Sequence, residues 1–392
     1  MARTLLLVGA RLEAVKAARR LGLACGVVAE SGATTRALRR LASGVGVAPP
    51  DAPVEVLEAA ARAAIGSATP DAIVAATERG VVPAAVLRQR FGLPGLSVES
   101  ARAVREKPLM KARFQAAGLP CVPTLPVASE EEARRLARDL GRPVVVKALA
   151  SSGSRGTVVA TDDAVLASAV HALLASPLSG GAGLERFVDG RELSVELFVD
   201  RGRVAFTNLT EYVLPGRANL LPAPLEPPLK DDVEDLARRA AAACGLERGI
   251  GHLEIYLTQS GPIVGELAAR APGGRLMELM SRVYGFDAWA ESLRLELGDD
   301  GFVPPPVAQR ACGNLFFHPG AGTVASVRGW TAARTLPGVA LATLSLRPGQ
   351  VVPPREGTGQ TVGQLVVEGE RADAVRETLL TAHRLVRIAM RP

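Results

Sequence analysis

Residues Gly251–Arg270 read GHLEIYLTQSGPIVGELAAR, and the rest of the chain is interpreted outward from this segment. Two apolar segments are joined by Gln259–Pro262, which is typical of a β-hairpin. A turn centred on Ser260 would place Glu254 and Glu266 opposite each other on one face. Directly paired residues have Cβ atoms about 4.5–5.5 Å apart, and like charges there repel. We therefore expect a cation between them.

Two carboxylates at that separation suit Mg²⁺ when substrate phosphates supply its remaining oxygens. Taken alone, the pair has a simpler interpretation, which is a hairpin that carries two solvated glutamates. The remainder of the chain has to decide between these two interpretations.

The composition describes a globular protein of two or three domains. The chain has 392 residues, of which 48% are hydrophobic and 22% charged. Aromatic residues make up only 4%, so base-stacking surfaces are not expected. The net charge of +6 is spread over short arginine pairs in helix-like segments, which favours solvated helix faces over a nucleic-acid interface.

Neither a membrane segment nor a metal-binding cysteine pattern is visible. Thr4–Ala10 is apolar but too short to span a bilayer, so we expect a buried strand there. The four cysteines lack CxxC spacing, which indicates neither a zinc site nor a disulfide framework. Both observations favour a cytoplasmic protein with no membrane partner.

Lysine is rare in this chain. Of 46 basic residues only five are lysine: Lys16, Lys107, Lys111, Lys147 and Lys230. Because lysine is a compact charge suited to phosphate, each of these positions is a candidate contact for an anionic ligand.

Residues 1–96 predict a doubly wound domain with a parallel sheet. Strands at Thr4–Val8, Ala24–Ala29 and Ile73–Ala75 alternate with helical segments, which is typical of a Rossmann-like unit. The first turn, beginning at Gly9, lacks the second glycine of G-x-G-x-x-G, so dinucleotide binding is not favoured.

Residues 97–303 form the next expected domain. A helical segment carries Lys107, and the strand Pro143–Ala148 ends close to Lys147. The loop Ser151–Gly156 follows, and its backbone N–H groups could hold phosphate oxygens. As an isolated feature, however, it also fits an ordinary hairpin turn.

The later segments are less regular. We expect an irregular loop at Glu211–Ala223, followed by the helix Asp231–Cys244. A third domain, residues 304–392, should contain short strands and a closing helix at Ala372–Met390. Within the middle domain we place one lobe at about 112–186 and the second at about 187–303.

The order of these parts resembles the ATP-grasp superfamily, its biotin-carboxylase-like branch and, within that branch, the L-amino acid ligases. The resemblance covers most of the chain and is strongest from Lys107 to Gly274. It implies an α/β architecture with an N-terminal Rossmann-like domain, a two-lobed α+β nucleotide clamp and a small C-terminal α+β domain.

The resemblance also implies which residues bind ATP. They are two lysines, a flexible phosphate loop, a hinge next to adenine and an acid at the ribose. In this chain they correspond to Lys107, Lys147, Ser152, Gly153, Ser154, Gly156, Glu185, Arg186, Phe187, Val188 and Glu192.

By the same resemblance, Glu254 and Glu266 hold Mg²⁺, with Mn²⁺ as a substitute. Arg270 and Lys147 are the implied catalytic residues, with Arg270 stabilising the reacting phosphate or acyl phosphate. One departure concerns Ala268, because many relatives have a metal-binding Asn there. The number of metal ions is therefore left open.

Residues for the other substrates are harder to predict. Arg217 and Arg275 could each hold a carboxylate through a bidentate fork, or could simply be solvent-exposed arginines. Asn219 lies in the same expected loop as Arg217, and His252 lies two residues before Glu254. We include Asn219 and His252 as substrate candidates.

The expected function is ATP-dependent joining of a small carboxylic acid to an amine through an acyl phosphate. Two alternatives stay open: an ATP-grasp enzyme that activates formate or bicarbonate, and a nucleotide-binding protein without turnover. The expected partners are small molecules and not nucleic acid, and a homodimer is compatible with this reading.

Overall fold

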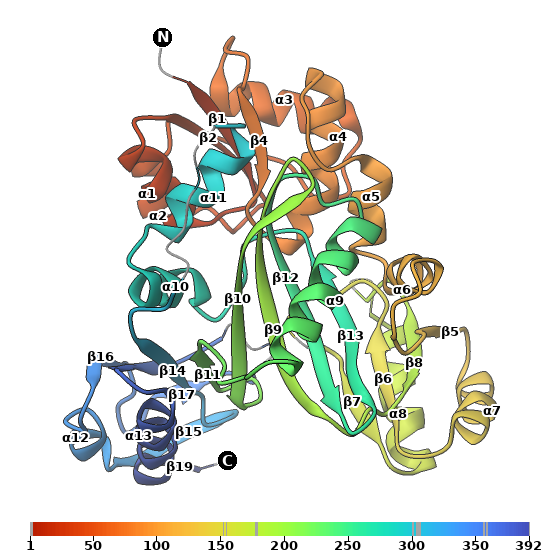
Figure 1. Cartoon of the computed structure of the whole chain (residues 1–392), viewed down its shortest axis with the longest axis vertical. Helices are drawn as coiled ribbons and strands as arrows, with labels where there is room; N and C mark the ends of the chain where they lie inside the picture. The colour runs from red at the N-terminus through yellow and green to blue at the C-terminus, as the bar shows by residue number, and fades with distance from the viewer. Residues whose placement is uncertain are drawn as a thin grey trace.

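The N-terminal residues form a four-stranded parallel sheet with the order β3-β2-β1-β4 (Figure 1). This computed structural model describes residues 3–391 except 152, 154, 177–178, 300–301, 303–306, 356 and 358–359. The strands are β1 (Thr4–Val8), β2 (Ala24–Ala29), β3 (Gly44–Val47) and β4 (Ala72–Ala75). The expected doubly wound unit is therefore present, with β3 as an additional strand.

Helices cover both faces of this sheet. They are α1 (Leu12–Arg20), α2 (Arg36–Leu41), α3 (Val54–Ile65), the 3₁₀ turn η1 (Glu78–Gly80) and α4 (Val81–Phe91), which ends at a left-handed Gly92. A later helix, α11 (Ala288–Glu296), packs on the same sheet through Trp289 and Leu293, which share a core with Leu5 and Leu7.

Two short helices lead from this unit into a small antiparallel sheet. They are α5 (Val98–Ala103) and α6 (Lys107–Ala116); α6 begins at the expected break, with Pro108 in its first turn. The sheet has the order β5-β8-β6-β7, with strands β5 (Leu125–Val127), β6 (Val144–Ala148), β7 (Val158–Ala160) and β8 (Ala182–Arg186).

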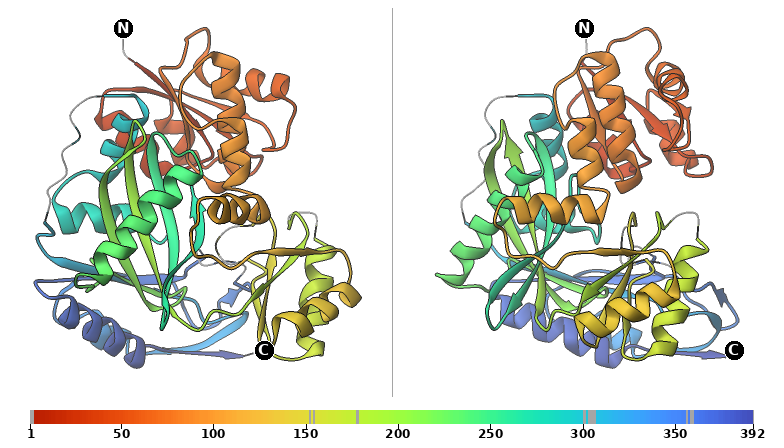
Figure 2. Two further views of the ribbon diagram at one scale, coloured as in Figure 1. Left: turned by 45° about the vertical axis from the view of Figure 1, so that its right-hand side comes forward. Right: turned by 90° about the vertical axis from the view of Figure 1, so that its right-hand side faces the viewer.

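Helices α7 (Glu130–Leu140) and α8 (Asp163–Leu174) bury their apolar faces against the small sheet. The start of α7 is well defined, because the Ser129 side chain accepts a hydrogen bond from the backbone of Glu132 and three glutamates occupy the first turn. The small sheet and these two helices form a lobe beside the large sheet (Figure 2).

A second, larger sheet has eight strands in the order β13-β12-β9-β10-β11-β14-β18-β16. Its strands are β9 (Arg191–Asp200), β10 (Arg203–Leu214), β11 (Ala218–Leu221), β12 (Gly249–Thr258), β13 (Gly261–Ala268), β14 (Ala311–Phe317), β16 (Val339–Leu344) and β18 (Gly363–Gly369). Helices α9 (Leu229–Ala243) and α10 (Leu276–Tyr284) pack against it.

Two sequence-based expectations were wrong. Glu211–Ala223 is not an irregular loop, because β10 continues to Leu214 and a tight turn leads into β11. The closing helix, α13 (Ala372–Leu385), ends before Met390, because Arg387–Arg391 pairs with β15 as strand β19.

The C-terminal segment is completed by β15 (Gly322–Arg328), α12 (Trp330–Ala333) and β17 (Val351–Val352), and β17, β15 and β19 form a three-stranded sheet. Its other strands extend the large sheet, because β14 pairs with β11. In the described part of the chain, no helix combines the length and apolarity that a bilayer crossing requires.

Candidate active site

The hairpin of β12 and β13 brings Glu254 and Glu266 together, although its turn differs from the expected one. The pair nearest the turn is Thr258 with Gly261, so the turn centres between Gln259 and Ser260 and not on Ser260. A bulge then shifts the register by one residue, and Leu253 pairs with Leu267. The bulge restores the register that a turn on Ser260 would have given.

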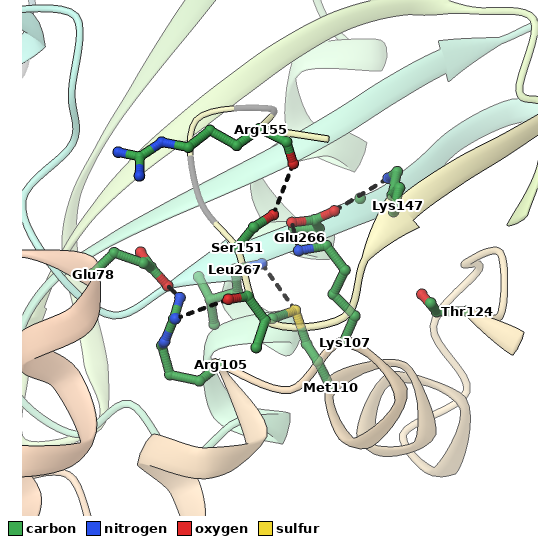
Figure 3. Close-up of polar contacts among 12 residues, drawn as sticks. Glu78, Arg105, Lys107, Met110, Thr124, Lys147, Ser151, Arg155, Glu266 and Leu267 are labelled. Atoms are coloured by element: carbon green, nitrogen blue, oxygen red, sulfur yellow. Dashed lines mark hydrogen bonds and ion pairs between the residues drawn. The ribbon is translucent and has the colours of Figure 1, made fainter. Parts of the chain in front are cut away.

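Lysines surround Glu266 from two directions (Figure 3). Lys107 Nζ, at the start of α6, lies 3.0 Å from Glu266 Oε2. Lys147 Nζ, on β6, lies 3.1 Å from Glu266 Oε1. Burial opposes ionisation of Glu266, but Lys147, Lys107 and then Lys111 outweigh it and lower its pKa to about 2. Glu266 is therefore a stable carboxylate.

Lys111 has a different role from its neighbour one turn earlier. Its Nζ donates to the backbone oxygen of Gly265 at 2.7 Å and is buried. Burial lowers its pKa. Lys111 thus holds the bulged part of β13 in place next to the carboxylates.

Glu254 and Glu192, two further carboxylates near Glu266, have too few positively charged neighbours to offset their burial. Burial and then the charge of Glu266 raise the pKa of Glu254. Burial and then Glu254 raise the pKa of Glu192 to about 8. Ionised, these groups would be stabilised by a further cation between them.

The residues present therefore fit a divalent ion. The described residues contain no cluster of three or more His, Cys, Asp or Glu side chains with metal-ligand geometry. Two carboxylates must then be supplemented by oxygens from a ligand, as Mg²⁺ sites with phosphates generally are.

Lys147 is fixed by a second carboxylate, Glu185, at 2.9 Å. The other oxygen of Glu185 accepts a hydrogen bond from Thr124 at 2.5 Å. The Glu185 side chain is therefore engaged in orienting Lys147. The Arg186–Val188 segment continues from β8 with Arg186 and Phe187 exposed, and its contact with adenine stays a prediction.

The loop between β6 and β7 borders a cavity that Lys107, Glu254 and Glu266 also line. Ser151 and Gly153 line it, and Ser151 Oγ donates to the backbone oxygen of Arg155 at 3.2 Å. Gly153 and Gly156 both have positive φ, of 65° and 70°, which favours glycine. Two predicted contacts, Ser152 and Ser154, lie outside the described residues.

The sequence analysis missed Glu78 and Arg105. Glu78, directly after β4, accepts from Arg270 Nε and Arg105 Nη1, each at 2.7 Å. Burial opposes ionisation of Glu78, but Arg270 and Arg105 outweigh it and lower its pKa. A signal existed, because ligand sites in parallel sheets gather at the carboxyl ends of strands.

Arg105 extends this network to the phosphate loop. Its Nη2 donates to the backbone oxygen of Ala150 at 3.4 Å (Figure 3). Glu78 and the two arginines all line the cavity, which has a volume of about 450 Å³. Arg270 is thereby held in place by Glu78 at the cavity.

The four substrate candidates divide into two groups. Asn219 and His252 line the cavity, whereas Arg217 and Arg275 are not among its described lining residues. Arg217 is exposed at the turn between β10 and β11. Asn219 is held by a hydrogen bond to Asn314 at 3.0 Å, which could not be expected from the sequence.

Lys107, Glu254, Glu266, Glu78 and the two arginines line one cavity, and Lys147 reaches Glu266 from the small sheet, which is an arrangement typical of an ATP-grasp domain. Two family models match the chain. Residues 106–210 match the ATP-binding domain of the carbamoyl-phosphate synthase L chain, and residues 315–391 match the L-amino acid ligase C-terminal domain 2.

Curated relatives include the L-arginine-specific L-amino acid ligase of Bacillus subtilis, 27% identical over 58% of this chain. Carnosine synthase 1 of Homo sapiens is 27% identical over 60% of this chain. The matched segments cover 58% and 31% of these two relatives, respectively.

Solved structures share the whole fold. An L-amino acid ligase from Bacillus licheniformis superposes with a TM-score of 0.77 at 18% identity, over 100% of this chain and 99% of that one. A carboxyaminoimidazole ribonucleotide synthase from Aspergillus clavatus, complexed with ATP, gives 0.78 at 16% identity, over 98% of each chain. The chain thus contains ATP-grasp domains and is homologous to L-amino acid ligases and biotin carboxylases, and the expected fold class is confirmed.

Proposed function

We propose that this protein is an ATP-dependent carboxylate–amine ligase that forms an amide bond through an acyl phosphate and releases ADP and phosphate. The observation that carries the proposal is that Lys107, Glu254, Glu266 and Arg270 line one cavity, with Lys147 in contact with Glu266 at its edge. The relatives named above, which include ligases of amino acids, support the choice of substrates.

Each residue has a task in this reaction. Lys107 and Lys147 bind the nucleotide phosphates as compact charges. Each lysine then contacts a phosphate oxygen in place of Glu266. Glu254 and Glu266 would hold Mg²⁺, which when bound neutralises charge on the transferred phosphoryl group. Arg270, fixed by Glu78, faces the same region and stabilises charge that develops on transfer.

Phosphorylation is chemically necessary for the coupling. A carboxylate is a poor electrophile, because attack by an amine would have to expel oxide. Transfer of the γ-phosphoryl group gives the acid a phosphate leaving group, which the amine then displaces. In the described part of the site, the positively charged side chains lie around Glu254 and Glu266, the proposed Mg²⁺ ligands. Because these groups would stabilise charge on a phosphoryl group bound to Mg²⁺, their placement favours transfer of the γ-phosphoryl group over adenylation.

Oxygen labelling tests the proposal. With ¹⁸O in the carboxyl group of the acid, label should appear in released phosphate, since the leaving group carries that oxygen away. Labelled AMP would indicate adenylation and refute the proposal. ATP hydrolysis without label transfer would refute coupling to a carboxylic acid.

A second candidate is activation of bicarbonate, because the carboxyaminoimidazole ribonucleotide synthase fold matches as well as the ligase fold. The two are separated by measuring ADP release in bicarbonate-depleted buffer. Amine-dependent release that persists there favours the ligase, and release that requires added bicarbonate favours the alternative.

A further inference from the structure

A buried carboxylate stands behind the cavity wall with both oxygens fully engaged. Glu196 on β9 is 0% exposed. Its Oε1 accepts from Ser194 Oγ at 2.8 Å and contacts His252 Nδ1 at 3.0 Å, and its Oε2 accepts from Asn208 at 2.6 Å and Thr210 at 2.7 Å. Burial opposes ionisation, but the hydrogen bond from His252 and the others outweigh it and lower the pKa of Glu196.

The ionised Glu196 determines how the imidazole of His252 is used. A carboxylate can only accept hydrogen bonds, so the hydrogen between the two groups lies on Nδ1 of His252. Nε2 is directed toward the Tyr212 hydroxyl, 3.5 Å away, and both residues line the cavity. In its neutral form, a histidine with hydrogen on Nδ1 offers Nε2 to a ligand as a hydrogen-bond acceptor.

The position of His252 along β12 indicates which ligand it meets. Tyr256, Glu254 and His252 alternate on one face, about 6.7 Å apart at each step. Tyr256 lies close enough to Lys147 for the lysine charge to oppose the rise that burial causes in the pKa of Tyr256. His252 therefore lies beyond the metal carboxylate, on the side away from the nucleotide lysine.

The residue opposite His252 leaves space beside it. His252 pairs directly with Ala268 on β13, so the two side chains share a face, and Ala268 also lines the cavity. A methyl group cannot take a metal or a polar ligand, and it leaves the imidazole as the polar partner there.

We propose that the space between His252 and Ala268 receives the amino group of the amine substrate, that Nε2 of His252 accepts its hydrogen bond, and that Glu196 is the positioning residue. This inference rests on the proposed ligase function. The carboxylates of Glu254 and Glu196 would repel a carboxylate of the ligand at this position and would attract an N–H donor. The substrate class is therefore a primary amine such as the amino group of an amino acid.

Steady-state kinetics tests the contact. Common L-amino acids serve as the amine, with acid and Mg-ATP saturating, in wild type, His252→Ala, Glu196→Gln and the control His171→Ala on exposed α8. We expect the KM for the amine to rise about tenfold or more in His252→Ala, and less in Glu196→Gln, with ATP affinity by calorimetry changed less than about twofold. An unchanged amine KM, or an equal loss of ATP affinity, would overturn the inference.

A spectroscopic measurement is independent of turnover. Nitrogen NMR of ¹⁵N-histidine-labelled protein at alkaline pH should find His252 with hydrogen on Nδ1 in wild type and a mixture of tautomers in folded Glu196→Gln. Hydrogen on Nε2 in wild type would overturn the inference whatever the function. Absence of amine-dependent ADP release in wild type would instead overturn the proposed function.

Discussion

Glu266 connects the large sheet with the small sheet and with α6. It belongs to the large sheet, yet its carboxylate contacts Lys147 from the small sheet and Lys107 from α6. In the proposed function, a metal ion and a nucleotide would therefore replace lysine contacts that already exist. The two lysines hold Glu266 ionised.

Glu266→Gln should abolish metal-dependent turnover, because the neutral amide loses one of the two charges that Mg²⁺ requires. ADP release measured over a Mg²⁺ titration, with Glu131→Gln on exposed α7 as the control, tests this. Near-normal activity at saturating Mg²⁺ would exclude the metal site.

Lys147 and Arg270 should separate ground-state binding from the chemical step. Lys147→Ala should weaken ATP binding about 10- to 100-fold, since it loses a charged contact with phosphate. Arg270→Ala should lower kcat about 10²-fold or more while ATP affinity changes only a few-fold. Calorimetric ATP titrations beside kcat, with Lys230→Ala as an exposed-lysine control, check the division, and equal affinity losses would refute it.

Only part of the β12–β13 hairpin could be predicted from the sequence. Apolar alternation and the turn composition identify the hairpin and its two glutamates from sequence. The bulge is different, because it depends on Lys111 binding Gly265 from another element. Glu78, Arg105 and Glu196 were likewise missed, since their partners come from distant parts of the chain.

Gly265→Ala tests the bulge. A Cβ at Gly265 would lie 2.9 Å from the backbone oxygen of Glu254 and 3.1 Å from its Cβ, so Glu254 must move. We expect Mg-ATP affinity to fall about tenfold or more, because small displacements of metal ligands are costly. Gly251→Ala, whose Cβ would meet only flexible leucine ends, is the control in a calorimetric titration; equal losses in both variants would contradict the bulge argument.

At the scale of the whole molecule, Glu78 connects the N-terminal sheet to the clamp. It binds Arg270 after β13 and Arg105 before α6, and Arg105 reaches the loop that follows β6. The sequence predicted the order of these parts but not this contact. The proposed domain limit near residue 304 also hides a continuity, because β14 extends the large sheet beyond it.

Glu78→Gln should destabilise the protein in a pH-dependent way. The folded pKa of Glu78 lies below its unfolded value, so its stabilisation is present above the ordinary carboxyl pKa and is lost as pH falls through the folded value. We expect a loss of about 3 kcal/mol in the free energy of unfolding at neutral pH, shrinking on acidification. Urea unfolding across a pH series tests this, and a difference independent of pH would contradict it.

The lysine distribution has a practical consequence for protein chemistry. Lys107, Lys111 and Lys147 are buried around the site, whereas Lys16 and Lys230 are exposed on α1 and α9. Among the lysine side chains, an amine-reactive dye or resin should therefore attach at the two exposed positions and leave the lysines of the proposed active site unmodified. The enzyme can then be immobilised or labelled without engineering a tag, and slow acylation of Lys107 or Lys147 would report on opening of the clamp.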